Sequence, residues 1–260
     1  MKITSIGGPT ALIEIDGFRL LTDPAFDPAG SEFTNGPSTL YKTAGPTMTP
    51  EQVDPVDAVL LSHDQHYDNF DRSGREFSLR APRLVTTPSG AKRLGGAAVG
   101  LSPWESTKLA TKNSSASLTI TSAPARHGPP GIEPMSGAVT GFIVQPGNER
   151  EPTVYITGDT VWYEGVADVA QRFDVTAIVL FAGAARVPSR TPEHLTMNVE
   201  DAIATARAFP KARIFPVHHH GWKHFSENLQ SLVDGFVKAG LSDRLQPMMP
   251  GDSADLIFQA

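Results

Sequence analysis

The amino-acid sequence predicts a layered α/β protein. Short apolar runs with the length of β-strands recur along the 260 residues, and segments with helical periodicity lie between and after them. This order of strands and helices is typical of sheets covered by helices. No low-complexity linker and no short-period repeat divides the chain, so we expect one domain over residues 1–260.

Strands are expected first in the N-terminal part of the chain. Residues 2–6 and 10–15 are rich in β-forming residues, and Asp16-Gly17 is a hairpin signal before a returning strand at 18–21. Residues 24–46 contain many Gly, Pro, Ser, Thr and Asn residues, so we expect a long irregular segment there. Long irregular segments in compact domains are often functional.

Strands and helices alternate in the rest of the chain. Further strands are expected at 56–61, 82–87, 118–123, 139–144, 153–157, 177–181 and 212–217. Helices are expected at 89–94, 199–209 and 226–239. Asn198 is a suitable N-cap for the second of these helices, and Gly240 ends the third.

Composition excludes several classes of protein. Apolar residues make up 40% of the chain and charged residues 19%, which is an ordinary globular balance. The net charge is −6 and the chain has no run of Lys or Arg, so we expect no nucleic-acid partner. Because there is no Cys, a transition metal would be held by His and carboxylate side chains.

The sequence also lacks the patterns of export and membrane insertion. Residues 1–8 do not show a basic segment followed by an apolar core, as a signal peptide would. No apolar run approaches the roughly 20 residues that a membrane-spanning helix needs. We therefore expect a cytoplasmic protein without a membrane partner, and the sequence leaves its oligomeric state open.

Side chains that can bind metal follow four of the expected strands. These side chains are His63, His127, Asp159 and His218. Strand ends are rigid, and the loops just beyond them can converge on one point. This pattern favours a common site.

The densest group of such residues is the octapeptide 62–69. Neutral imidazole and carboxylate suit Zn²⁺, Mn²⁺ or Fe²⁺. His63, His66 and Asp68 can face one cavity if the strand continues into a turn or helix start. The alternative is a polar loop that carries its His and Asp residues for solubility alone.

Several motifs resemble the metallo-β-lactamase superfamily in their order along the chain. Within it, the sequence is similar to the branch of ascorbate-6-phosphate lactonases and N-acyl-phosphatidylethanolamine phospholipase D. The resemblance implies a four-layer αββα sandwich with the site along one edge of the two sheets. The motifs are Leu21-Thr22-Asp23-Pro24, Leu61-Ser62-His63 through Asp68-Asn69-Phe70-Asp71, Ala125-Arg126-His127-Gly128-Pro129, Thr157-Gly158-Asp159-Thr160 and Pro216-Val217-His218.

The resemblance also implies a ligand set. By it, one metal is held by His63, His66 and His127. Asp159 bridges to a second metal, which is also held by Asp68 and His218.

The first metal loop departs from the family pattern in two ways. It has one extra residue, and Asn69 stands where the family usually has its last His, so we expect a weaker second metal position. An ungapped register would make Gln65 the second ligand instead of His66 and place Tyr67 at the position of Asp68. Ligand chemistry favours His66, and the choice between His66 and Gln65 stays open here.

Four further residues are candidates for supporting roles. Asp23 and Asp64 could orient a ligand His, although Asp23 also suits a turn before Pro24. Arg126 could pair with a phosphate or carboxylate of a substrate, and His224 could bind substrate or donate a proton. Either could also be an ordinary surface or helix-entry residue.

These residues predict a metal-dependent hydrolase. One or two divalent ions, with Zn²⁺ favoured over Mn²⁺ or Fe²⁺, would activate a water, and Asp68 would be the catalytic residue that orients the water or moves its proton. The expected substrate is a small ester-like molecule, either a lactone or a phosphodiester. The alternatives are a redox protein or a non-catalytic metal-binding protein on the same fold. A redox role is disfavoured because the chain has no flavin-binding segment.

Overall fold

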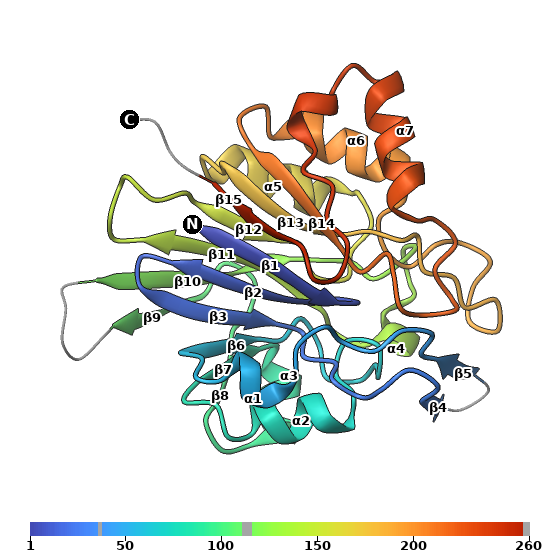
Figure 1. The fold of residues 1–260 in the computed structure, drawn as a ribbon, viewed down its shortest axis with the longest axis horizontal. Coiled ribbons are helices and arrows are strands. Elements are labelled where there is room, and N and C mark those ends of the chain that lie inside the picture. The colour runs from blue at the N-terminus through green and yellow to red at the C-terminus, as the bar shows by residue number, and fades with distance from the viewer. Residues whose placement is uncertain (36–37, 111–115, 257–260) are drawn as a thin grey trace.

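The computed structural model describes residues 1–35, 38–110 and 116–256, and two β-sheets packed face to face form its centre (Figure 1). The 7-stranded sheet has the order β15-β1-β2-β3-β6-β7-β8. Its strands are β1 (Lys2–Gly7), β2 (Thr10–Ile15), β3 (Phe18–Thr22), β6 (Ala58–Leu60), β7 (Leu84–Thr86), β8 (Ala98–Gly100) and β15 (Ser253–Asp255). The 6-stranded sheet has the order β14-β13-β12-β11-β10-β9. Its strands are β9 (Ser106–Ala110), β10 (Ser117–Pro124), β11 (Thr140–Pro146), β12 (Val154–Ile156), β13 (Ala177–Phe181) and β14 (Arg213–Val217).

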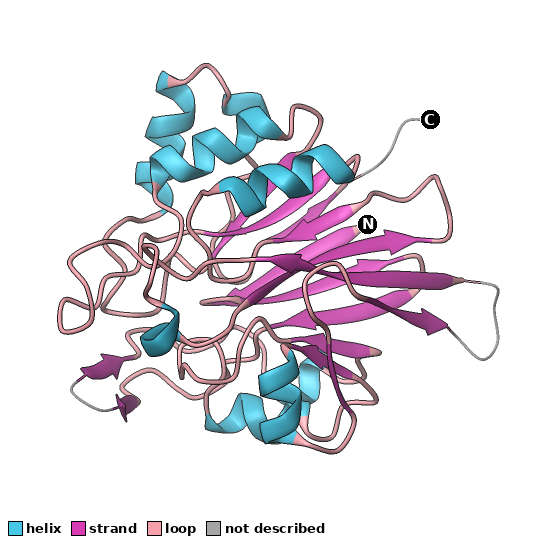
Figure 2. Ribbon diagram, turned by 180° about the vertical axis from the view of Figure 1, so that it is seen from behind, coloured by secondary structure: helices cyan, strands magenta, loops and turns pink. Residues whose placement is uncertain are grey.

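Helices cover the outer face of each sheet (Figure 2). The helices over the first sheet are α1 (Pro50–Val53), α2 (Arg72–Ser78) and α3 (Pro88–Leu94). Those over the second sheet are α5 (Glu164–Arg172), α6 (Val199–Ala208) and α7 (Leu229–Lys238). The remaining elements are the short helix α4 (Glu133–Ser136), the 3₁₀ turn η1 (Ser242–Arg244) and the strands β4 (Glu32–Asn35) and β5 (Ser38–Tyr41).

The alternation of side chains along β13 shows why four layers form. Ala177, Val179 and Phe181 join the apolar core between the two sheets. Ile178 and Leu180 point the other way and pack into the core under α5, α6 and α7. Both faces are therefore buried, as expected for a central strand with parallel neighbours. The predicted αββα sandwich is confirmed.

The strands that lead to the expected ligands run in a common direction within each sheet. In the first sheet β3 and β6 are parallel. In the second sheet β12, β13 and β14 are parallel. β10 is two antiparallel pairings away from β12 and so runs the same way. The carboxyl ends of these strands therefore lie at one edge of each sheet, and the loops that follow them can meet.

The prediction of an irregular segment over residues 24–46 is wrong in part. β4 and β5 pair antiparallel within it, and residues 36–37 between them lie outside the described residues. Phe33 on β4 is buried and stacks on Tyr67, with ring centroids 4.8 Å apart. The strand pattern in this segment is weak, because its few apolar residues stand among many residues that are typical of turns. The hairpin packs on the loop that carries the expected ligands.

The other differences concern short elements and the boundaries of several strands and helices. The prediction omitted α1, α2, α4, α5, β8, β9 and β15, which are short or carry few apolar residues. α7 begins at Leu229 rather than at Ser226, because the Asn228 side chain accepts a hydrogen bond from Ser231 N and caps the helix. The capping role of Asn198 on α6 is confirmed by its bond from Asp201 N. Among the described residues, no helix is long and apolar enough to cross a membrane.

A buried ion pair fixes the start of α2 against the N-terminal part of the chain. Lys42 Nζ donates to Asp71 Oδ2 at 2.9 Å, and both side chains are buried. The Asp71 carboxylate also accepts hydrogen bonds from the backbone N–H groups of Phe26, Asp27 and Gly74. Asp71 therefore caps the helix and also neutralises the positive charge of the buried Lys42 side chain.

We expect Asp71→Ala to lower the free energy of unfolding by about 3–5 kcal/mol, because it leaves the Lys42 ammonium buried without a counter-charge. The matched control is Asp174→Ala. Asp174 pairs with Lys211 at 2.8 Å, but the two side chains are 71% and 67% exposed, so the loss there should stay below about 1 kcal/mol. Urea denaturation measures both values. Equal losses in the two variants would contradict the role assigned to Asp71.

Candidate metal centre

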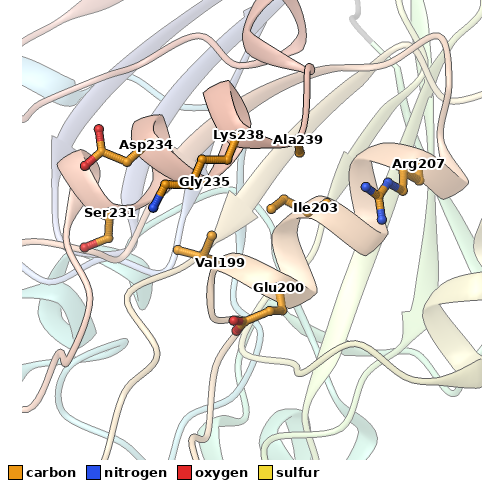
Figure 3. Close-up of a pocket in the computed structure, with 9 residues that line it drawn as sticks. All are labelled: Val199, Glu200, Ile203, Arg207, Ser231, Asp234, Gly235, Lys238 and Ala239. Atoms are coloured by element: carbon orange, nitrogen blue, oxygen red, sulfur yellow. The ribbon is translucent and has the colours of Figure 1, made fainter.

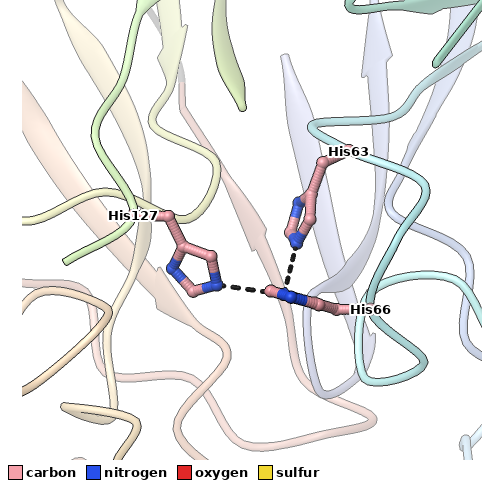
Figure 4. A group of neighbouring side chains, drawn as sticks. All are labelled: His63, His66 and His127. Carbon is pink, nitrogen blue, oxygen red and sulfur yellow. Dashed lines mark hydrogen bonds between the residues drawn. The ribbon is translucent and has the colours of Figure 1, made fainter. Parts of the chain in front are cut away.

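Three buried imidazoles converge where β6 and β10 end (Figure 4). His63 directly follows the strand region of β6, His66 lies in the next turn, and His127 follows β10. His66 Nδ1 lies 2.9 Å from His63 Nε2 and 3.1 Å from His127 Nε2. One ring nitrogen of each His therefore faces the same small volume, and we call this group the His cluster.

Hydrogen bonds behind the His cluster fix two of the rings. His127 Nδ1 donates to the carbonyl oxygen of Leu195 at 2.8 Å, which leaves a lone pair on Nε2. His63 Nδ1 lies 2.9 Å from Ser62 Oγ, and that hydroxyl donates to Asp23 Oδ2 at 2.6 Å. Asp23 thus acts on His63 through Ser62, in a position to orient a ligand His.

Burial keeps the imidazoles of His63 and His66 neutral. It lowers the pKa of His63 to about 4 and moves the pKa of His66 well below its ordinary value. The neighbouring imidazoles lower the pKa of His66 further. Neutral imidazole is the form that has a lone pair for a metal ion. His63 and His66 therefore have the protonation state of ligands in a transition-metal site.

A second group combines two carboxylates and an imidazole. The ligand atoms of Asp68, Asp159 and His218 all lie within 4.8 Å of one another, and we call this group the Asp cluster. His218 Nδ1 is 3.2 Å from Asp159 Oδ1, and His218 Nε2 is 3.6 Å from Asp68 Oδ2. Asp159 Oδ2 lies 3.5 Å from His127 Nε2, so Asp159 also connects the two clusters.

Unsatisfied atoms in the Asp cluster show that these residues fit a bound cation. Asp68 Oδ1, Asp159 Oδ2 and both ring nitrogens of His218 are buried and have no hydrogen-bond partner. Buried polar atoms without partners are costly, and a divalent cation would satisfy several of them together. The donor set of imidazole and carboxylate is also the one that Zn²⁺ and related ions use.

Electrostatic interactions within the Asp cluster are strong. Burial alone would lower the pKa of His218, but the carboxylates of Asp159 and Asp68 outweigh it and raise that pKa to about 10. Burial alone would raise the pKa of Asp68 and of Asp159, but His218 and other neighbouring imidazoles hold both well below the usual range. Both carboxylates are therefore ionised, which is the form that binds metal, whereas His218 would have to release its proton when a cation binds.

The side-chain amide nitrogen of Asn69 is occupied by hydrogen bonds within the protein. Its side-chain Nδ2 donates to Asp23 Oδ2 at 3.1 Å and to Asp159 Oδ1 at 3.2 Å. A different imidazole lies beside the Asp cluster. It belongs to His224, whose Nε2 donates to Asp68 Oδ2 at 2.9 Å. His224 comes from the loop after β14, so the sequence order gives no hint of this contact.

Backbone strain accompanies the site. His218 has φ of +58° and Asp23 has φ of +28°, a region that non-glycine residues seldom adopt. The His218 N–H donates to the Gly8 carbonyl oxygen at 2.7 Å, which holds the strained turn. Gly158, before Asp159, has φ of +59°, and a Cβ there would lie 2.5 Å from the Thr140 carbonyl oxygen. Strain of this kind is characteristic of functional sites.

The structure places the remaining predicted site residues as follows. His66 joins the His cluster, and Gln65 is not one of its three residues. Asp64 is turned to Arg93 and forms an ion pair with it at 2.5 Å, so it is not directed at a ligand His. The Arg126 guanidinium lies over the ring of Tyr163, 4.5 Å from its centroid, and is not directed into the clusters.

Sequence reasoning missed one residue of the site, Arg190. Its Nη1 lies 2.8 Å from His66 Nε2, on the side of the ring away from the His cluster. It lines a small pocket over the two clusters, together with Leu40, Ala185, Val187, Leu195, His66, Asp68, His127 and His224. Arg190 lies in an irregular stretch with no strand end and no ligand spacing, so no sequence signal indicated it.

A larger cavity lies elsewhere in the described part of the chain. It is a groove between α6 and α7 that is lined by Val199, Ile203, Gly235 and neighbouring residues (Figure 3). None of its lining residues belongs to either cluster. The site is therefore defined by converging ligand atoms and not by the size of a cavity.

An αββα sandwich with His and Asp side chains at one edge of its sheets is the arrangement of the metallo-β-lactamase class. A family model described as "Beta-lactamase superfamily domain" matches residues 18–219, and the chain belongs to this family. It is a metal-dependent hydrolase of the metallo-β-lactamase superfamily.

Relatives match over nearly the whole chain. UPF0173 protein YddR of Bacillus subtilis is 25% identical over 99% of this chain and 100% of its own length. A UPF0173 metal-dependent hydrolase of Exiguobacterium sp. is 24% identical over 93% of this chain and 96% of its own. The structure of an isothiocyanate hydrolase from Delia radicum gut bacteria is similar with a TM-score of 0.82 and 23% identity, covering 98% of this chain and 99% of that one.

We expect the double variant His63→Ala, His127→Ala to lose about one equivalent of bound metal, because it removes two of the three imidazoles of the His cluster. Elemental analysis of protein purified without an affinity tag measures the content. The matched control is His194→Ala, which removes an imidazole paired with Asp201 outside both clusters and should leave the metal content unchanged. An unchanged content in the double variant would contradict the assignment.

We also expect metal titrated into metal-free protein to bind with two unequal affinities, the tighter one at the His cluster. The reason is that Asn69 offers no imidazole to the Asp cluster and uses its amide N–H groups on Asp23 and Asp159. Competition with a chromophoric chelator resolves the two steps. Two equally tight Zn²⁺ sites would refute this expectation.

Proposed function

We propose that the two clusters hold one or two divalent metal ions, with Zn²⁺ in the His cluster, and that the protein hydrolyses a small lactone or phosphodiester. The observation that carries the proposal is the buried pair of clusters joined by Asp159. His63, His66 and His127 would hold the first ion, and Asp68, Asp159 and His218 the second. Two carboxylates in the Asp cluster also suit a harder ion such as Mn²⁺.

The chemistry requires an activated water and a place for its proton. A metal ion bound here would act as a Lewis acid on the scissile group and make water a nucleophile near neutral pH. Asp68 is the catalytic residue of the proposal. His224 Nε2 donates to its Oδ2 and holds the carboxylate in place, so that the carboxylate can orient the water or accept its proton.

The lining of the pocket supports a small substrate with an apolar part. Leu40, Val187 and Leu195 form apolar walls, and the guanidinium of Arg190 adds a positive charge. The net charge of −6 opposes the approach of a nucleic acid, whereas a small anion responds mainly to the local field of the site. The sequence resemblance to lactonases and N-acyl-phosphatidylethanolamine phospholipase D supports the same substrate classes.

The alternatives from the sequence receive less support. A relative that matches 93% of this chain is named a metal-dependent hydrolase, which favours hydrolysis over a non-catalytic or redox role. The single domain and the cytoplasmic location stay predictions.

We expect turnover of a lactone panel or of a bis-aryl phosphodiester, and none of a chromogenic cephalosporin or of single-stranded RNA. Asp68→Asn should lower kcat by about 10²–10⁴-fold, because it removes the group that accepts the proton. His194→Ala should retain the activity of the unaltered protein. Steady-state assays of the metal-loaded protein measure each rate.

The panel includes an isothiocyanate, because a structure similar to this chain is that of an isothiocyanate hydrolase. Turnover of the isothiocyanate, of the cephalosporin or of RNA, with silence on lactones and phosphodiesters, would overturn the substrate proposal. Loss of metal without loss of activity would overturn the metal-dependent mechanism.

A further inference from the structure

The two ring nitrogens of His66 have different partners. Nδ1 faces the His cluster, where it lies 2.9 Å from His63 Nε2 and 3.1 Å from His127 Nε2. Nε2 faces Arg190 Nη1 at 2.8 Å. A guanidinium can only donate hydrogen bonds. Nε2 of His66 must therefore be the acceptor, and in a neutral ring the N–H is then on Nδ1.

This tautomer is consistent with hydrogen bonds among the three imidazoles of the His cluster, without a metal ion between them. The Nδ1–H of His66 points at the Nε2 lone pairs of His63 and His127. Those lone pairs are available because the opposite nitrogens of both rings contact Ser62 Oγ and the Leu195 carbonyl oxygen. The three imidazoles and Arg190 thus form one hydrogen-bonded chain.

A bound cation is incompatible with this series of hydrogen bonds. A metal ion in the His cluster needs the lone pair of His66 Nδ1, so the ring proton has to be on Nε2. An N–H on Nε2 and the N–H of Arg190 are both donors and cannot bond to each other. The contact between Arg190 and His66 therefore belongs to the metal-free cluster only.

The surroundings of Arg190 allow its side chain to move while its backbone stays in place. The backbone is held in a turn by the bond from Arg190 N to the Val187 carbonyl oxygen at 2.8 Å. Ser189 Oγ bonds to Ser38 Oγ at 2.7 Å and ties the turn to β5. In the described part of the chain the guanidinium forms no ion pair, so no carboxylate holds it on His66.

The small size of the pocket over the clusters also favours movement of the Arg190 side chain. With Arg190 on His66 its free volume is about 20 Å³, which holds about one water and no organic substrate. Arg190 is one of its walls, next to Leu40 and Val187. Movement of this long side chain away from His66 would enlarge the pocket and leave an unpaired guanidinium in it.

We propose that Arg190 is a metal-dependent anion-binding residue: metal binding at the His cluster displaces its guanidinium from His66, and the freed guanidinium then binds a carboxylate or phosphate group of the substrate. Guanidinium recognises both groups through paired N–H donors. The inference rests on the metal centre of the proposed function and names the specificity residue of that site. It does not depend on which bond is hydrolysed.

The first test reads the tautomer of His66 directly. Long-range ¹H–¹⁵N spectra of ¹⁵N-labelled protein should show the proton on His66 Nδ1 in the metal-free protein and on Nε2 after addition of Zn²⁺. This measurement needs no variant and no substrate. A proton on Nε2 in the metal-free protein would overturn the proposal.

The second test is the Zn²⁺ affinity of Arg190→Met, measured by competition with a chelator. Because Arg190 stabilises only the metal-free cluster, its loss should tighten Zn²⁺ binding about tenfold or more. A residue with a merely structural role would weaken binding when removed. The matched control is Arg186→Met, whose guanidinium bonds to the Pro192 carbonyl oxygen and Ser226 Oγ, and it should leave the affinity unchanged. Unchanged or weaker Zn²⁺ binding by Arg190→Met would contradict the proposal.

The third test uses phenylphosphonate as an inert anion in calorimetric titrations. Zn²⁺-loaded protein should bind it, Arg190→Met should bind it at least about tenfold more weakly, and Arg186→Met should match the unaltered protein. Equal binding by Arg190→Met would overturn the anion-binding role. Absence of lactonase and phosphodiesterase activity, with these three results intact, would reject the proposed substrates and leave the role of Arg190 standing.

Discussion

Burial of two clusters of metal-binding side chains is the constraint on which the rest of the site depends. His63, His66 and His127 place three imidazole nitrogens around one volume, and Asp68, Asp159 and His218 surround an adjacent one. Several of these atoms have no partner within the protein. Groups of this kind destabilise a fold unless a cation completes them, so folding and metal binding are expected to be coupled.

The surrounding residues can be understood as supports of this arrangement. Asp23 orients His63 through Ser62, and its strained backbone is held at the end of β3. The Leu195 carbonyl oxygen fixes His127 in the same way. Each support acts on the ring nitrogen opposite to the cluster, which sets the tautomer and leaves the lone pair on the inner nitrogen. His66 is different, because its outer nitrogen faces Arg190, a donor.

That difference gives the two sides of the site distinct roles. The rings of His63 and His127 are bound to acceptors that are compatible with a metal ion, so they are ready for one. The contact of His66 is compatible only with the metal-free state, so it is the part of the His cluster that must change. Arg190 is one wall of the small pocket, so its displacement would widen the pocket when the metal is bound. Substrate recognition and metal binding are thereby linked through a single hydrogen bond.

The sequence by itself determined the fold class and indicated the residues that the structure brings together in the two clusters. Alternation along strands such as 177–181 indicates which faces are buried, and a His or Asp directly after a rigid strand is a local signal that needs no knowledge of the partner strands. The tertiary structure alone decided what those residues contact. His224 reaches Asp68 across 156 positions of the chain, and Arg190 reaches His66 across 124. Such contacts arise when loops from different strand ends fold over one edge of the sandwich, and no local pattern of residues encodes the distance between two loops.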